Sequence, residues 1–210
     1  DIAGGIDADA YNLNVQNGGG LNVLPDATVT VQNFVAVDPT GAFTIQNSGS
    51  LIQVQDQAHI DYVANTGIID MERTANIRDT DYVYWSSPVD NFAVTNISPT
   101  TSVAYIYDWT PTLASNTNGF GIWEHTTETM ITGKGYIVRA PSAFNATPQN
   151  YTATFTGTPN NGTLTRTITR GTYTGADYVG PTALMVTSDD DNWNLIGNPY
   201  PSAIDAQAFM

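Results

Sequence analysis

Short alternations of apolar and polar residues fill the first sixty positions of the chain. The apolar members come in pairs two residues apart, which is the spacing of inward side chains on a short β-strand. The pairs are Leu13 and Val15, Leu21 and Val23, Val29 and Val31, Val35 and Val37, and Phe43 and Ile45. Turn-forming segments such as 18–20 (Gly-Gly-Gly) and 38–41 (Asp-Pro-Thr-Gly) separate the pairs. The pattern predicts short strands joined by tight corners.

A short repeat accompanies these strands. Val-Gln-Asn occurs at 15–17 and 31–33, and Ile-Gln-Asn occurs at 45–47. The strings VQNGGGL and IQNSGSL align without a gap at an offset of about 30 residues, which predicts β-solenoid coils of that length with two or three strands each. A β-meander built from similar hairpins is the alternative interpretation.

The strands that follow are longer and more aromatic. In the segment 81–89, Tyr82 and Tyr84 share one face of the expected strand and Trp85 lies on the other. Further strands are expected at 103–109, 120–123, 135–139, 151–155, 164–168, 183–186 and 193–196. Asn-Gly at 161–162 predicts a hairpin. We therefore expect an all-β chain with a β-solenoid-like segment at 1–72 and a β-sandwich or jelly-roll-like domain at 73–210.

The C-terminal residues resemble the first turn of a helix, with Ser202 as the N-cap and Asp205 three positions later. The sequence stops before a helix of ordinary length is complete. We therefore expect the native polypeptide to continue beyond Met210, so that the sandwich is truncated there, and the repeats to begin before Asp1.

The charge of the chain argues against some classes of partner. Twenty acidic residues against six basic ones give a formal net charge of −14, and Lys134 is the one lysine. Such a chain is not expected to bind nucleic-acid phosphates or an anionic membrane surface. The absence of cysteine excludes disulfides, thiolate metal sites and cysteine nucleophiles. No apolar run approaches the roughly 18 residues of a membrane span, so direct membrane insertion is not expected either.

Four strings carry a resemblance to a known kind of module. They are DYVYWSSPV at 81–89, GKGYIV at 133–138, FTGTPNNGTLT at 155–165 and WNLIGNPYPSAIDAQAF at 193–209. In this order they resemble a module of large secreted surface proteins of Bacteroidota, especially flavobacteria, which look like adhesin-like cargo of the type IX secretion system. The resemblance covers about residues 70–210. It implies export to the cell surface or the medium as part of a larger protein, and it implies no catalytic residue.

The titratable residues do not form a recognisable catalytic pattern. Glu124 and Glu128 are a close glutamate pair, but on a strand they would lie about 13 Å apart, beyond the roughly 5–9.5 Å that glycosidase carboxyls need. His59 and His125 fall in different expected domains, and neither a G-x-S-x-G nor an H-E-x-x-H pattern is present. We therefore expect that the protein is not an enzyme.

Two candidate binding features remain. Asp189, Asp190 and Asp191 crowd into one turn, where their carboxylate oxygens could bind Ca²⁺ or could simply be hydrated. Trp109 and Trp123 are the candidates for a carbohydrate platform, because exposed aromatic rings stack on sugar rings; core packing is the alternative for both.

These observations predict a non-catalytic extracellular module, structural or adhesive, in a larger exported surface protein. The alternative is a carbohydrate-binding module that serves a secreted hydrolase. The expected partners are neighbouring domains of the same polypeptide and surface glycans. Self-association into filaments through unpaired strand edges of the N-terminal segment is a further expectation.

Overall fold

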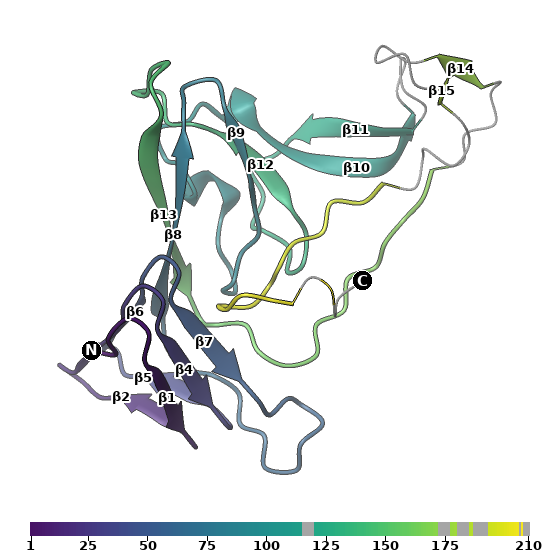
Figure 1. The fold of residues 1–210 in the computed structure, drawn as a ribbon. Helices are drawn as coiled ribbons and strands as arrows, with labels where there is room; N and C mark the ends of the chain where they lie inside the picture. Colours follow the sequence, from purple (N-terminus) through teal and green to yellow (C-terminus); the bar gives the residue numbers. More distant parts are fainter. Residues whose placement is uncertain (115–119, 172–176, 180–184, 187–192, 206, 208–210) are drawn as a thin grey trace.

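The computed structural model describes residues 1–210 except 115–119, 172–176, 180–184, 187–192, 206 and 208–210. The described residues are almost entirely β, as the composition predicts (Figure 1). The strands are β1 (Asp7–Ala10), β2 (Leu13–Val15), β3 (Gly20–Val23), β4 (Thr28–Val31), β5 (Val35–Val37), β6 (Ala42–Ile45), β7 (Ser50–Gln53), β8 (Ile69–Ile77), β9 (Tyr82–Trp85), β10 (Ile106–Ala114), β11 (Phe120–His125), β12 (Tyr136–Arg139), β13 (Gln149–Gly157), β14 (Tyr178–Val179) and β15 (Met185–Val186). Two single-turn 3-10 helices, η1 (Val94–Asn96) and η2 (Val103–Tyr105), lie between them.

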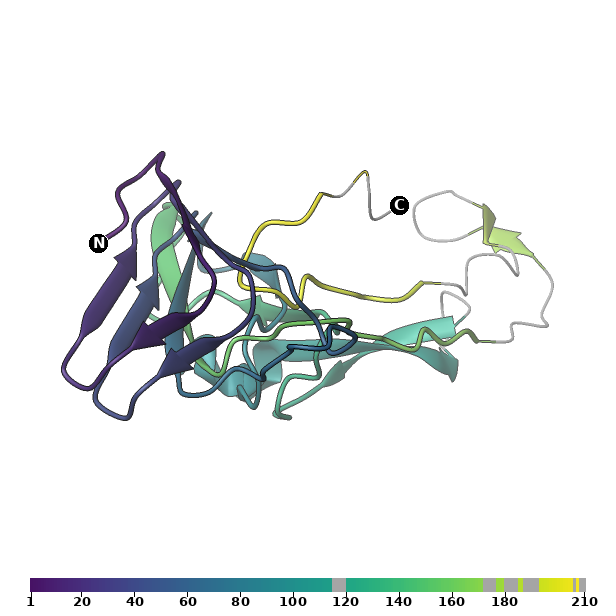
Figure 2. The same ribbon diagram turned by 90° about the horizontal axis from the view of Figure 1, so that it is seen from below.

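The first seven strands pair in three parallel ladders, which we call the parallel stack (Figure 2). β1 pairs with β4 and β4 with β7, β2 pairs with β5, and β3 pairs with β6. Paired positions lie about 22 residues apart in the sequence, so that Val15 is opposite Val37. The expected offset of about 30 residues is therefore wrong. Strands of only three or four residues let three strands and three corners fit into the shorter repeat.

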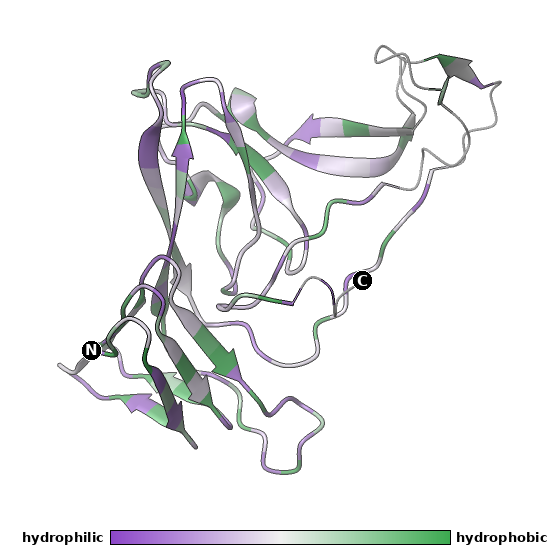
Figure 3. Cartoon of the chain, in the orientation of Figure 1, coloured by the Kyte–Doolittle hydropathy of each residue, from purple (hydrophilic) through white to green (hydrophobic). Residues whose placement is uncertain are grey.

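Alternate side chains of the parallel stack point inward. Figure 3 shows the resulting alternation of hydrophobic and hydrophilic positions along these strands. The buried members are Val15, Val23, Val29, Val31, Val35, Val37, Phe43, Ile45 and Leu51. β-branched residues suit these positions because their side chains pack well on a pleated surface. The alternative of a β-meander is excluded for these strands because they pair in parallel.

β8 is hydrogen-bonded on both of its edges. Near its start, Met71 lies opposite Ile45 and continues the β3–β6 ladder in parallel. Along its whole length it pairs antiparallel with β13, from Ile69 opposite Gly157 to Ile77 opposite Gln149. Figure 1 shows this two-stranded ribbon leaving the parallel stack. The expected domain boundary near residue 72 lies inside β8, and the division into two domains stays a prediction.

A second sheet packs against this ribbon. Its strands are all antiparallel and follow the order β11-β10-β12-β9. The ring of Phe155 on β13 lies 6.0 Å from that of Trp85 and 4.9 Å from that of Phe92, so the two sheets face each other as in a β-sandwich. One cluster of buried residues runs from Val15 in the parallel stack to Phe155, which gives the described chain a continuous core.

The segment after β13 does not form the expected hairpin. Asn161 donates from Nδ2 to the carbonyl of Gln55 at 3.0 Å, and Thr163 donates to the carboxylate of Asp56 at 2.8 Å. These polar groups therefore bind the chain next to the parallel stack and no strand forms at 164–168. Strand formation at 193–196 is reduced to one bridge between Lys134 and Ile196.

At the C-terminal end, the expected capping role of Ser202 is not seen. The carboxylate of Asp205 instead accepts from the backbone N–H of Gln207 at 2.8 Å. No helix in the described part of the chain is long and apolar enough to cross a membrane.

The continuous core leads to a test of cooperativity. Val23→Ala should lower the free energy of unfolding by about 2 kcal/mol, because Val23 is fully buried in the strand farthest from β8 in its ladder. All four tryptophans lie at position 85 or later, so their fluorescence reports on the other half of the molecule. In urea, tryptophan fluorescence and far-UV circular dichroism should shift to lower midpoints by the same amount. An unchanged fluorescence midpoint would show that the parallel stack unfolds separately.

Candidate functional site

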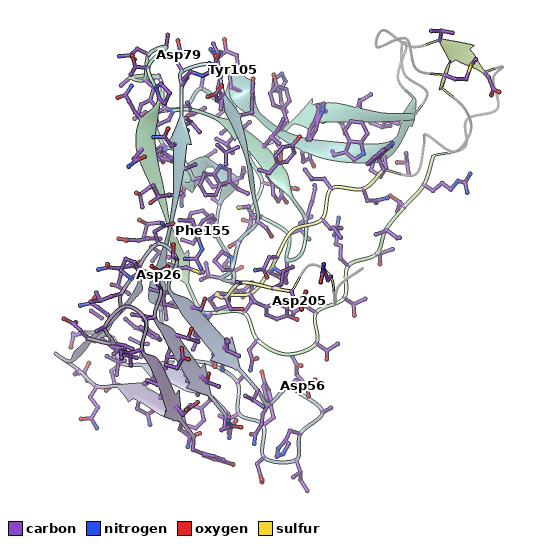
Figure 4. All side chains as sticks on the ribbon, in the orientation of Figure 1. Asp26, Asp56, Asp79, Tyr105, Phe155 and Asp205 are labelled. Carbon is purple, nitrogen blue, oxygen red and sulfur yellow. The ribbon has the colours of Figure 1, made fainter. Side chains whose placement is uncertain are left out.

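The outward side of the sheet β11-β10-β12-β9 carries aromatic side chains on three of its strands. Trp109 lies opposite Trp123, and Tyr107 lies opposite His125, so each pair projects from the same side. The alternate residues, such as Tyr136 and Ile106, are buried against the core. We call this outward surface the aromatic face; it consists of Tyr82, Tyr84, Tyr107, Trp109, Trp123 and His125. Figure 4 shows side chains standing along β10 and β11.

The rings of the aromatic face touch one another in two groups. Trp109 and Trp123 meet edge to face with ring centroids 5.1 Å apart, and Tyr84 lies 6.5 Å from Trp123. Tyr107 lies 4.4 Å from the His125 ring, and Tyr82 lies 6.0 Å from Tyr107. Such contacts fix the orientation of rings that would otherwise rotate in solvent.

The two tryptophans differ in how open they are. Trp123 is 40% exposed and Tyr84 is 65% exposed. The indole of Trp109 instead covers Gly121, where an added Cβ would lie 2.1 Å from a ring carbon, and its Nε1 donates to the carbonyl of Trp193 at 3.0 Å. The structure thus brings the two expected platform residues together and leaves Trp123 as the more accessible one.

Sequence analysis did not assign Tyr84, Tyr107 and His125 to this surface. For Tyr84 the signal was present, since alternation in the strand placed Tyr82 and Tyr84 on one face, and their exposure confirms that placement. Tyr107 and His125 could not be found in this way, because their pairing depends on the register between β10 and β11.

The opposite side of the same sheet holds a charged network around the single lysine. The ammonium of Lys134 lies between the carboxylates of Asp108 and Glu128, and its side chain is only 12% exposed. It donates to Glu128 Oε1 at 2.7 Å, and Tyr136 donates to the same oxygen at 2.6 Å. The Tyr136 hydroxyl also accepts from the N–H of Ile131 at 2.9 Å. This network fastens the loop before β12 to β10.

The network also changes the acidity of its members. Burial acts to raise the pKa of Glu128, but hydrogen bonds from Lys134 and Tyr136 hold that pKa below its ordinary value. Burial, followed by the hydrogen bond to Glu128, raises the pKa of Tyr136. Glu128 is therefore ionised and Tyr136 neutral at neutral pH, so the tyrosine serves as a hydrogen-bond donor.

The remaining expected residues do not meet in one place. Glu124 accepts from Thr110 at 2.6 Å, whereas Glu128 is held by Lys134. His59 Nδ1 accepts from the N–H of Asp61 at 3.2 Å. Asp189, Asp190 and Asp191 lie outside the described residues, so calcium binding at that turn stays a prediction. Within the described residues there is no group of three or more histidine or acidic side chains placed to hold a metal ion.

Comparison with known proteins gives a family but no activity. A family model described as a domain of unknown function, DUF8693, matches residues 1–210, and the chain belongs to this family. No curated protein and no solved structure matches the chain.

The position of Trp109 over Gly121 can be tested by adding one methyl group. Gly121→Ala should displace the indole, because the backbone there has a φ of +93° and the new Cβ would overlap the ring. We expect a change in near-UV circular dichroism and a loss of stability of about 1–3 kcal/mol. Gly20→Ala is the matched control, since nothing lies within 4 Å of its added Cβ. Equal effects of the two variants would contradict the assigned position of Trp109.

The Lys134 network predicts a pH dependence of stability. The pKa of Glu128 is lower in the folded than in the unfolded state, so its ionised form stabilises the fold above about pH 4.5, and this contribution is lost as the pH falls. Between about pH 5 and 3 the wild type should therefore lose more stability than Glu128→Gln. Because Glu128 is partly exposed, the difference should be no more than about 1 kcal/mol.

Melting temperatures measured across this range test the prediction. Glu72→Gln serves as the control, because Glu72 makes no ion pair within the described structure. Wild type and Glu128→Gln losing stability in parallel on acidification would show that Lys134 and Tyr136 do not stabilise the ionised carboxylate.

Proposed function

We propose that this family member is a non-catalytic extracellular module, structural and adhesive, of a larger exported surface protein. In this proposal the first 72 residues are a short β-solenoid-like rod, which is supported by three parallel ladders with one common offset. The remaining residues form a sandwich or jelly-roll-like domain at its end. The strings that resemble surface proteins of Bacteroidota support display at the cell surface after type IX secretion.

One observation carries the adhesive part of the proposal, namely the exposed rings of the aromatic face. Trp123 and Tyr84 are large, partly apolar and adjacent, yet they are not used by the core. Contiguous exposed aromatic side chains are typical of contact surfaces. These rings stand on strands of a four-stranded sheet, so little conformational entropy is lost when they make a contact.

The charge of the aromatic face also favours contact. The outward positions that we assign to it carry no acidic residue among those described, although the chain has a net charge of −14. Asp108 and Glu124, which lie on β10 and β11, occupy alternate positions on the opposite side. This surface can therefore approach an acidic or uncharged polymer with less repulsion than the rest of the chain.

The unpaired edge of β1 supports a second contact in the proposal. It pairs with β4 on one side, and its other edge has no partner among the described strands. A strand from a neighbouring domain or from a second copy would fit this edge. Asp7 and Asp9 project from β1 into solvent, and their repulsion disfavours the second copy. A neighbouring domain of the same polypeptide is therefore the favoured partner, ahead of a filament.

The second candidate function is a carbohydrate-binding module that serves a secreted hydrolase. Edge-to-face packing of Trp109 and Trp123 favours it, because the exposed part of such a pair can stack on a sugar ring. The two candidates use the same face and differ in selectivity: an adhesive module binds several surfaces, whereas an accessory module binds one polysaccharide.

Adsorption to a panel of surfaces tests both. Purified protein is mixed with cellulose, chitin, a pectic polysaccharide and polystyrene beads, and the bound fraction is measured. Trp123→Ala and Tyr84→Ala should each weaken binding by about tenfold, as expected for central aromatic contacts. Tyr11→Ala is the control, because Tyr11 is 56% exposed but belongs to the parallel stack.

The pattern of binding separates the candidates. Binding to several surfaces supports adhesion, and binding to one polysaccharide alone supports the accessory module. Absence of binding throughout the panel, or an equal loss in Tyr11→Ala, would refute the assignment of the aromatic face as the contact surface.

A further inference from the structure

Arg139 extends the aromatic face at one end and lines a separate pocket. It lies opposite Tyr82 in the pairing of β12 with β9. The pocket has a volume of about 250 Å³, and its walls include Tyr105, Phe144 and Asp79. Figure 4 labels Asp79 and Tyr105, which lie close together at the end of the molecule remote from the parallel stack.

The guanidinium of Arg139 is held in place but not neutralised. Its Nε donates to the backbone carbonyl of Asp79 at 2.7 Å, and its central carbon lies 4.6 Å from the centre of the Tyr105 ring. Its two terminal nitrogens make no hydrogen bond or ion pair with the described residues. Lys134 and Arg78, in contrast, are paired with carboxylates. The pocket therefore has an oriented and unpaired cation in an acidic protein.

Further donors and apolar walls surround this cation. The hydroxyl oxygen of Ser102 accepts from the N–H of Ala104, which leaves its own proton free to donate. Ser142 lies in the pocket with an exposed side chain. Phe144 and Tyr105 supply two aromatic surfaces. Donors beside aromatic walls match a small ring that carries a negatively charged acceptor.

We propose that this pocket binds the carboxylate of an acidic sugar, a uronate residue of a glycan that lies along the aromatic face. The two terminal nitrogens of Arg139 match the two oxygens of a carboxylate, and such paired hydrogen bonds are short and directional. The volume lies below the roughly 300–1,000 Å³ of pockets for drug-sized ligands, so it suits a single sugar residue. The inference that the ligand is a glycan rests on the proposed function.

Asp79 makes the proposal sharper, because its carboxylate lines the same pocket without forming an ion pair with Arg139. It must repel the carboxylate of the ligand. Removing that negative charge should therefore tighten binding, whereas it would weaken the binding of a cationic ligand.

The experiment titrates the whole chain with methyl β-glucuronide and, separately, with methyl β-glucoside at 0.15 M NaCl, where a Debye length of about 8 Å screens the remaining charge. Binding is followed by NMR. The glucuronide should bind at least about tenfold more tightly, and Arg139→Gln should raise its Kd by about tenfold or more. Asp79→Asn should lower its Kd by about threefold. Arg170→Gln is the control, since it removes a positive charge from an exposed residue outside the pocket.

Equal binding of the two glycosides would overturn the proposal, and so would an unchanged Kd in Arg139→Gln or an equal loss in Arg170→Gln. If Arg139→Gln does not fold, the direction of the change in Asp79→Asn decides. One sugar fills only the pocket, so Trp123→Ala should leave the Kd for the glucuronide unchanged. Loss of adsorption in Trp123→Ala together with failure of the glucuronide titration would remove the uronate and keep the adhesive face; the reverse result would do the opposite.

Discussion

The pairing of β8 on both edges determines where the rest of the molecule lies. Through Met71 the strand closes the β3–β6 ladder of the parallel stack, and through its full length it joins β13. The resulting ribbon presents Phe155 to the second sheet, which packs on it through Trp85. That sheet has two sides, and its inner side is fully used by this core. The aromatic face is therefore the side that the fold leaves for solvent or for a ligand.

Side-chain amides hold the two halves together where strands do not. Asn65 accepts from the N–H of Val35 at 2.9 Å, exchanges hydrogen bonds with Gln53, and donates to the carbonyl of Pro159 at 2.9 Å. Asn161 makes a similar bond to Gln55. A chain with few charges and many amide and hydroxyl groups can satisfy its irregular backbone in this way. The Lys134 network is the main place where charge takes over this role, because Lys134 has two carboxylate partners there.

The sequence was most informative where one strand decides the outcome. Alternation identified Val29 and Val31 as inward residues and separated Tyr84 from Trp85, because a strand alone sets which side a residue takes. The offset between coils could not be obtained in the same way, since the repeated strings mark corners and not paired positions. The hairpin at 161–162 failed for a related reason, because Asn161 bonds to a residue more than a hundred positions earlier. Trp109 and Trp123 were named as a pair, but the burial of Trp109 depends on Gly121 across the strand and on the carbonyl of Trp193.

Native-state hydrogen exchange tests most directly whether β8 joins the parallel stack and the sandwich-like part into one structure. Amide protons of β6, β8 and β13 that are hydrogen-bonded in the sheet β13-β8-β6-β3 are followed in increasing concentrations of urea. If β8 holds the two parts together, these amides exchange through one global opening, with the same free energy and the same dependence on urea. Exchange of β6 through an opening of lower free energy, with β13 still protected, would contradict the account.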